Sequence, residues 1–221
     1  MMLAGDFLSS KLFPLKPTDS VQVALELMNE LNVAYLPVVE DGQVRGYLSV
    51  GNLLDQKPKS KKIGSLLPHT PAPIIQEKQH LFDVIRLFAN LPSTVVAVVD
   101  SEEKFLGIIS AKELIRQMAE FSGFLEAGSI LTLNIGLQDY SLSEIARIVE
   151  YNNAKILSVH LQALPDSRRI LVHLKLNTSD LKSLVATFER YNYQVTASYY
   201  NEDDQGALKD RFNLLMRYLD M

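Results

Sequence analysis

Two histidines, His160 and His173, are the residues whose type and spacing come nearest to a metal site. They lie on two alternating apolar and polar segments joined by a short turn, which predicts a hairpin that pairs them. Neighbouring imidazoles can bind a transition metal. Without a nearby Asp, Glu or Cys the ligand set is incomplete, so we interpret the pair as cross-strand neighbours on a solvated face and expect no metal.

The sequence contains no recognisable catalytic motif. It has no cysteine, which excludes thiolate nucleophiles, disulfides and thiolate metal sites. It shows no nucleophile elbow, HExxH helix, metal-spaced carboxylate set, kinase signature or glycine-rich phosphate loop. His69 and His80 are isolated. We therefore predict a protein that is not an enzyme, with no catalytic residues and no cofactor.

The amino-acid composition argues against some classes of binding partner. The 221 residues are 47% hydrophobic and 22% charged, with a net charge of -4, which is ordinary globular usage. Nucleic-acid binding needs a concentrated basic surface, and we expect no nucleic-acid partner.

The apolar runs are far shorter than the ~18 residues of a membrane span. Residues 1–11 lack the basic and apolar regions of a signal peptide. We expect a soluble, cytoplasmic protein with no membrane contact.

The first half contains an internal repeat with a period of about sixty residues. Residues 5–8 recur as 64–67, and the apolar residues of 21–31 recur in 81–91 at three- and four-residue spacing. That spacing predicts an amphipathic helix with one buried face in each copy.

Each predicted helix is followed by two predicted strands. These are 34–39 and 46–49 in the first copy, and 94–99 and 107–110 in the second. Each second strand ends at a serine whose hydroxyl suits the N-cap of a further helix. The polar segment 57–62 is interpreted as a solvated linker. Each unit is thus strand, helix, strand, strand, helix.

This pattern resembles a tandem pair of CBS domains over residues 1–122. The segments that carry the resemblance are LPVVEDG (36–42), GYLSVGN (46–52) and GIISAKE (107–113). The expected repeats are 1–58 and 59–122. The resemblance implies two repeats that face each other about an approximate twofold axis, with matched hollows at their seam that often hold adenosine-containing ligands such as AMP, ADP, ATP or S-adenosylmethionine.

Carried over by the resemblance, the ligand-binding residues are Ala34, Tyr35, Pro37, Ser49 and Asn52 in the first copy, and Thr94, Val95, Ala97, Ser110 and Glu113 in the second. The serines match a hydroxyl position of the family motif.

The sequence departs from the family pattern at three of these positions. Asn52 and Glu113 stand where the family usually has aspartate, and Ala97 replaces the proline found at Pro37. An asparagine both donates and accepts and has no charge. The alternative is therefore that Ser49 and Ser110 only cap helices, the pockets are degenerate, and the protein is a ligand-independent dimerisation and interaction scaffold.

From Gly128 the pattern changes to a βαββαβ order. The predicted strands are 130–137, 156–164, 170–176 and 194–200. A two-residue turn at 166–167 would pair Leu157 with Leu176, Val159 with Leu174, Leu161 with Val172, Ser158 with Lys175, and His160 with His173. The overall fold class is mixed α/β and α+β, with a ferredoxin-like second half.

Residues 128–202 resemble an ACT domain by topology, and the CBS-pair plus ACT order is similar to acetoin-utilisation regulatory proteins. Ligand-binding members use a glycine between the first strand and helix, whereas 138–141 contains none. We therefore favour a packing or dimerising role for this region. The resemblance implies a regulatory ligand sensor that forms a homodimer.

Residues 203–221 place apolar side chains on one helical stripe, which predicts a C-terminal amphipathic helix.

Overall fold

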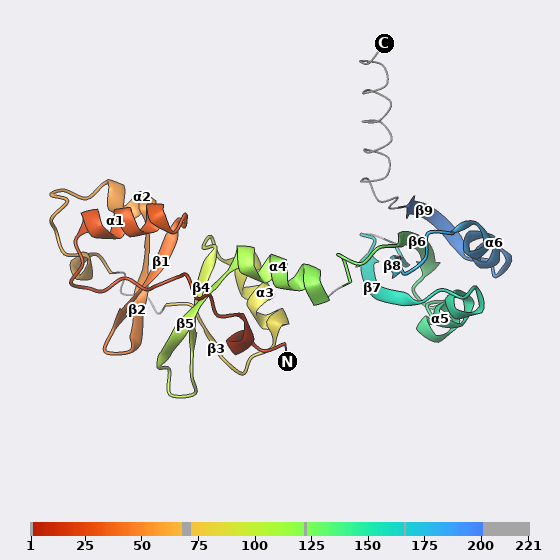
Figure 1. Ribbon diagram of the computed structural model, residues 1–221, viewed down its shortest axis with the longest axis horizontal. Coiled ribbons are helices and arrows are strands. Elements are labelled where there is room, and N and C mark those ends of the chain that lie inside the picture. The colour runs from red at the N-terminus through yellow and green to blue at the C-terminus, as the bar shows by residue number, and fades with distance from the viewer. Residues whose placement is uncertain (1, 68–71, 122, 166, 201–221) are drawn as a thin grey trace, which may run out of the picture. The chain divides into compact units, whose positions relative to one another are not determined.

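The computed structural model describes residues 2–67, 72–121, 123–165 and 167–200. The chain divides into two compact units, Met1–Met118 and Ala119–Met221 (Figure 1). His69 and the helix expected at 203–221 lie outside the described residues. In the described part of the chain, no helix has the length and apolar character to cross a membrane.

The first repeat follows the predicted order from its first helix onward, and the strand expected before that helix is reduced to an isolated bridge between Leu15 and Val38. Ser20 caps α1 (Val21–Glu30) by accepting a hydrogen bond from the Val23 N–H at 3.2 Å. The strands β1 (Tyr35–Glu40) and β2 (Gln43–Ser49) form an antiparallel hairpin that leads into α2 (Val50–Leu54).

The second repeat has the same helix, hairpin and helix, preceded by a strand, and so contains all five predicted elements. They are β3 (Ile74–Gln76), α3 (Leu81–Asn90), β4 (Val95–Val99), β5 (Phe105–Ser110) and α4 (Ala111–Phe121). His80 caps α3, because its Nδ1 accepts from the Phe82 N–H at 3.2 Å. A capping role accounts for this isolated histidine.

The backbones of the two copies match in detail. Each helix after the second strand begins with a hydrogen bond back to the residue before the first strand: Val50 N–H to Ala34 O at 2.9 Å, and Ala111 N–H to Thr94 O at 2.9 Å. The second strand of each hairpin also has one extra residue at the same place, Arg45 opposite Val38 and Val39 and Leu106 opposite Val98 and Val99. The predicted internal repeat is therefore confirmed.

The two copies exchange their leading segments. The 3-10 helix Ala4–Phe7 packs into the core of the second repeat, where Ala4 and Phe7 are buried. The matching 3-10 helix Ile63–Leu66 packs into the first repeat through Ile63. Because each core contains residues from the other half of the unit, no single cut of the chain separates the two repeats.

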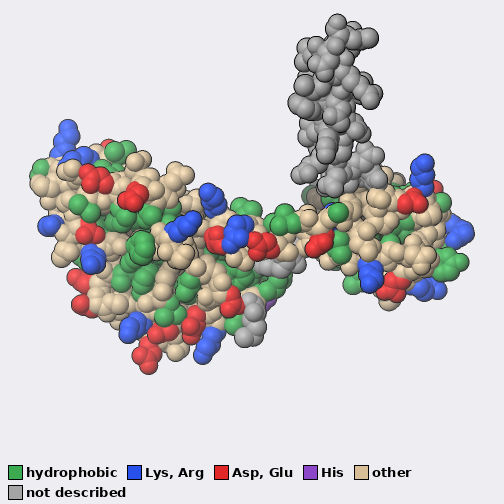
Figure 2. All heavy atoms as spheres, in the orientation of Figure 1, with side chains coloured by type: hydrophobic (Ala, Val, Ile, Leu, Met, Phe, Trp, Pro, Cys, Tyr) green, Lys and Arg blue, Asp and Glu red, His purple; other side chains and the backbone are tan. Residues whose placement is uncertain are grey.

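Figure 2 shows Lys, Arg, Asp and Glu side chains interspersed over the visible face of the first unit. This distribution suits the net charge of -4 and differs from the concentrated basic surface that phosphate backbones require.

Over its described residues, the second unit is a four-stranded antiparallel sheet with two helices on it. Its elements are β6 (Ser129–Gly136), α5 (Leu142–Tyr151), β7 (Ile156–Ala163), β8 (Arg169–Leu176), α6 (Lys182–Arg190) and β9 (Gln194–Tyr200). The strand order is β7-β8-β6-β9. Both helices pack on one face, because their buried residues share a core with alternate residues of β6 and β8.

The hairpin register is confirmed except at one end. Val159 pairs with Leu174, and His160 with His173. The predicted pairing of Leu157 with Leu176 is wrong, because the register shifts between Ile156 and Ser158 and Ile156 lies opposite Leu176. From Ser158 onward all the predicted pairs are observed. The bulge therefore leaves Leu157 unpaired, and the apolar side of β7 still faces the core.

Candidate functional site

In the first repeat, four of the predicted residues meet at one corner of the β1-β2 hairpin. Tyr35 lies opposite Ser49 in the strand register, and Ala34 O accepts from the Val50 N–H. The Ser49 hydroxyl accepts from the Asn52 N–H at 3.1 Å and donates to the Asn52 carboxamide Oδ1. Ala34 and Asn52 are exposed and Ser49 is half-buried. This corner therefore presents a hydroxyl and a carboxamide side by side to solvent.

The second repeat has the same corner, with a carboxylate in place of the carboxamide. Val95 lies opposite Ser110, and the Ser110 hydroxyl accepts from the Glu113 N–H at 3.1 Å. Thr94 is exposed, whereas Val95 is buried in the hydrophobic core of the first repeat. The polar half of the corner is thus accessible, and its apolar half is closed by packing.

Glu113 is held by its own helix. Arg116 donates to its carboxylate from Nη2 at 2.5 Å and from Nε at 3.2 Å, and Gln117 donates at 3.0 Å. These hydrogen bonds, with a smaller contribution from the positive charge of Lys11, lower the pKa of Glu113 to about 2. The carboxylate at this corner is therefore ionised near neutral pH and already paired.

Pro37 and Ala97 occupy equivalent positions of β1 and β4, and they differ in one backbone donor. Proline has no N–H, so Ala97 carries a donor that the first repeat lacks. The Tyr47 hydroxyl accepts from this Ala97 N–H at 2.7 Å and donates to Pro73 O at 2.8 Å. Burial raises the pKa of Tyr47 to about 12, although the Ala97 hydrogen bond opposes the shift. Tyr47 of the first repeat thus ties together two strands of the second.

Tyr47 was not among the predicted site residues. The replacement of proline by alanine at 97 was the available signal, because the extra N–H of a buried strand must find an acceptor. Ala97 has no exposed surface, so its side chain is buried, and its backbone N–H is bound to the Tyr47 hydroxyl. Pro37 is also buried. The two expected base slots are therefore alike in the burial of this residue and differ in the Tyr47 hydrogen bond.

The segments that flank the two corners are related by the repeat. Residues 9–12 correspond to 68–71, and the latter lie outside the described residues. The first of these segments passes the second repeat, where the Ser9 N–H donates to Ile108 O at 2.8 Å. Lys11 on this segment contributes positive charge near Glu113. The second corner thus combines a hydroxyl, a carboxylate and cationic groups, a set suited to binding polar ligands.

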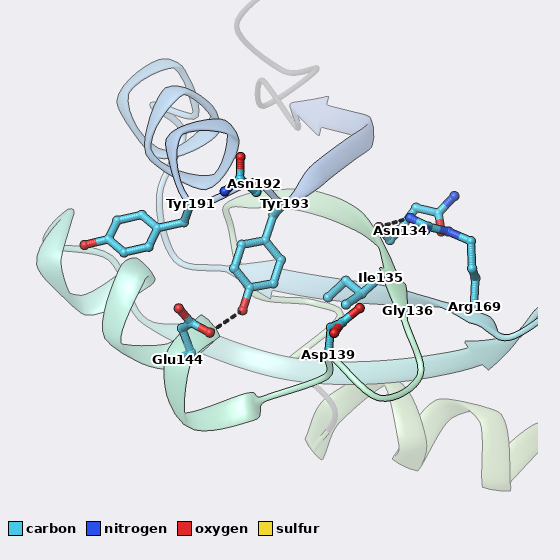
Figure 3. A pocket seen from close by; sticks show the side chains of 9 residues that line it. All are labelled: Asn134, Ile135, Gly136, Asp139, Glu144, Arg169, Tyr191, Asn192 and Tyr193. Carbon is cyan, nitrogen blue, oxygen red and sulfur yellow. Dashed lines mark hydrogen bonds between the residues drawn. The ribbon is translucent and has the colours of Figure 1, made fainter.

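The second unit contains a hollow of about 300 Å³ at the end of β6 (Figure 3). Two pairs of its polar groups are already engaged: Arg169 Nε donates to Asn134 Oδ1 at 2.7 Å, and the Tyr193 hydroxyl donates to Glu144 at 3.0 Å. Gly136 also lines this hollow, and a Cβ there would lie 2.4 Å from Asp139 Oδ2. A glycine therefore stands close to the strand-to-helix connection, two residues before the segment 138–141 in which none was found.

The two hairpin histidines have separate neighbours. His173 contacts the Thr132 hydroxyl at 3.0 Å and Gln162 Oε1 at 3.2 Å. His160 packs against the Phe124 ring with centroids 5.4 Å apart. Over the residues that the structure describes, no group of three or more His, Cys, Asp or Glu side chains could hold a metal ion.

Comparison with known proteins places the first unit. A family model for the CBS domain matches residues 4–58 and 63–120. The chloroplastic CBS domain-containing protein CBSX1 of Arabidopsis thaliana is 28% identical over 148 residues, which cover 51% of this chain and 62% of that one. An uncharacterized protein of Methanocaldococcus jannaschii is 24% identical over 116 residues, covering 52% and 44%. The chain spans about half the length of the curated relatives it matches.

Two solved structures are similar over the same part. CBSX2 of Arabidopsis thaliana, solved in complex with AMP, is 30% identical with a TM-score of 0.47, covering 54% of this chain and 98% of that one. A CBS domain pair/ACT domain protein from Thermotoga maritima is 20% identical with a TM-score of 0.49, and covers 54% and 98%.

Proposed function

This chain belongs to the CBS-domain family, and from that premise we propose that it is a regulatory sensor that binds an adenosine-containing ligand at the seam of its two repeats. The ligand class is AMP, ADP, ATP or a compound of the S-adenosylmethionine type. In this proposal the ligand binds one conformation of the protein more tightly than another. Only such a difference in affinity shifts the equilibrium between the two conformations.

The observation that carries the proposal is the duplicated corner at the end of each hairpin. Ser49 with Asn52 and Ser110 with Glu113 have the same spacing and the same capping hydrogen bond. A hydroxyl suits a phosphate oxygen, and a carboxamide or carboxylate suits the hydroxyls of a ribose. A capping box also places Glu or Gln three residues after the serine, but here the Glu113 carboxylate accepts from Arg116 and Gln117, and the Asn52 carboxamide accepts from the Ser49 hydroxyl.

The first corner is the better candidate for the ligand. Its Ala34 and Asn52 are exposed, so a base and a ribose can approach them without displacing protein groups. At the second corner Ala97 is fully buried with its N–H on Tyr47, and a base there would have to displace that hydroxyl. We place the binding residues in the first copy at Ala34, Tyr35, Pro37, Ser49 and Asn52.

The second unit is assigned a regulatory, ACT-like role over 128–202. Its support is the order β6-α5-β7-β8-α6-β9 with two helices on one face of the sheet. The single Arg169 of its terminal hollow is already bound to Asn134, which favours packing or dimerisation over amino-acid binding. A homodimer is part of the proposal, and light scattering on the full chain tests it.

The decisive experiment is calorimetric titration of the full chain with AMP, ADP, ATP and S-adenosylmethionine. We expect saturable binding of at least one, weakened about tenfold or more by Ser49→Ala. Asn52→Asp restores the charge that the family usually has there, and should strengthen binding of the same ligand. Ser20→Ala is the matched control, because it removes the equivalent cap of α1 far from the corner.

A different outcome supports the scaffold alternative. If none of the four compounds gives heat or a thermal shift at millimolar concentration while light scattering shows a stable dimer, the sensor proposal is overturned. If Ser49→Ala and Ser20→Ala weaken binding equally, the hydroxyl acts only as a cap.

A further inference from the structure

The sheet face of the second unit opposite α5 and α6 contains a largely buried lysine. Lys175 lies on β8 and is 6% exposed. The strand register places Ser158 of β7 on one side of it and Ile130 of β6 on the other. Its neighbours along β8, Leu174 and Leu176, point into the core beneath the helices. The ammonium group of Lys175 is therefore directed to the face opposite the helices.

Two polar groups at this place have no protein partner. Among the described residues, no carboxylate forms an ion pair with Lys175. The hydroxyl of Ser158, directly opposite Lys175, is buried and makes no hydrogen bond within that same part of the chain. Buried polar groups are normally hydrogen-bonded, so the buried Ser158 hydroxyl indicates a missing partner. The Lys175 ammonium beside it retains contact with solvent and can pair with an anion there.

The surroundings of these two groups form a hollow of about 600 Å³, within the range of small-molecule sites. Its walls include the large apolar side chains of Phe124, Ile130, Leu171 and Tyr199. Among the described residues that line it there is no Asp or Glu. His160 and His173 also line it: His173 contacts Thr132 and Gln162, and His160 packs on the Phe124 ring. Among its described lining residues, Lys175 is the one Lys or Arg.

We propose that this hollow binds a small monocarboxylate with an apolar body, whose carboxylate pairs with Lys175 and accepts from the Ser158 hydroxyl while the body packs against Phe124, Ile130 and Tyr199. The charge complementarity selects an anion, and the apolar walls exclude small, fully hydrated anions such as inorganic phosphate. This site is separate from the repeat seam and does not rest on the function proposed for it.

Titration of the full chain with hexanoate tests the proposal, with 1-hexanol and hexylamine as neutral and cationic compounds of the same length. We expect saturable binding of hexanoate, binding at least tenfold weaker for hexanol, and none for hexylamine. The side-chain NMR signals of Lys175 in the wild-type protein should shift with the same saturation curve, which requires no variant.

Lys175→Met keeps the aliphatic stem and removes the charge, and should reduce hexanoate affinity at least tenfold. Ser158→Ala should reduce it several-fold. Lys155→Met is the matched control, because Lys155 is an exposed lysine of the same unit. Binding of adenosine compounds should be unchanged in all three variants.

Two results would overturn the proposal. One is hexanoate binding that is absent, or equal in wild type and Lys175→Met. The other is an affinity that falls as protein concentration rises, since a second copy of the chain would then be what covers the face.

Discussion

The hydroxyl of Tyr47 lies 2.7 Å from the backbone nitrogen of Ala97, fifty residues further along the chain, and accepts its hydrogen bond. The same hydroxyl donates to Pro73 O. One side chain of the first repeat therefore satisfies two backbone groups of the second. The contact joins the two repeats and occupies the Ala97 N–H, which is on the strand where the proposal would put a base in the second repeat.

Tyr47→Phe should destabilise the first unit by about 1–3 kcal/mol, because it leaves the Ala97 N–H and the Pro73 carbonyl without their partner. Urea denaturation followed by far-ultraviolet circular dichroism measures this. Tyr151→Phe is the control: Tyr151 is 78% exposed, and a change there should stay within about 0.5 kcal/mol. Equal effects of the two substitutions would show that the Tyr47 hydroxyl contributes no stability.

Tyr47 also predicts a loss of stability at high pH. Burial raises its pKa from 10.0 to about 12, so above pH 10 the unfolded chain loses this proton before the folded one. The free energy of unfolding therefore falls between pH 10 and about 12, by at most about 1.4 kcal/mol per pH unit for this group. Urea titrations across this window should show the difference between wild type and Tyr47→Phe becoming smaller. A constant difference would contradict the assignment.

Local periodicity was enough to predict the repeat and most of the hairpin register. Val159 opposite Leu174 follows because a strand with one buried side tolerates no slip by one residue. The same rule failed at Leu157, because a bulge inserts an extra residue without turning the strand over. No local pattern signals where such an irregularity falls.

Contacts between the repeats were beyond sequence reasoning for a different reason. The exchange of the 3-10 helices depends on which core receives Phe7 and Ile63, and both residues are equally suited to either. The Tyr47 contact with Ala97 joins positions far apart in the chain. By contrast, Arg116 stands three residues after Glu113 on one helix, and that spacing alone predicts the ion pair.

The pairing of Glu113 predicts a measurable shift. Arg116→Gln should raise the pKa of Glu113 from about 2 toward its ordinary value of 4.5, since the Arg116 hydrogen bonds are the largest cause of the lowering. Carbon-13 NMR of the side-chain carboxyl as a function of pH measures it. Lys11→Gln should give a smaller shift in the same direction. Lys112→Gln, on the same helix, is the control and should leave the titration unchanged.

Gly128 gives the sharpest prediction for the second unit. Its φ is +143°, and a Cβ there would lie 1.9 Å from the carbonyl oxygen of Leu176. Because that oxygen belongs to the backbone of a central strand, it cannot move aside as a side chain can. Gly128→Ala should therefore destabilise this unit by about 2–4 kcal/mol.

Gly51→Ala provides the contrast for Gly128→Ala in the same denaturation assay. Gly51 lies in α2, and the nearest atom to an added Cβ is the Ser49 hydroxyl at 3.8 Å, which is ordinary contact. Since alanine favours a helix over glycine, the substitution should stabilise by up to about 1 kcal/mol. A Gly128→Ala protein as stable as the wild type would show that the chain enters β6 by a different path from the one described here.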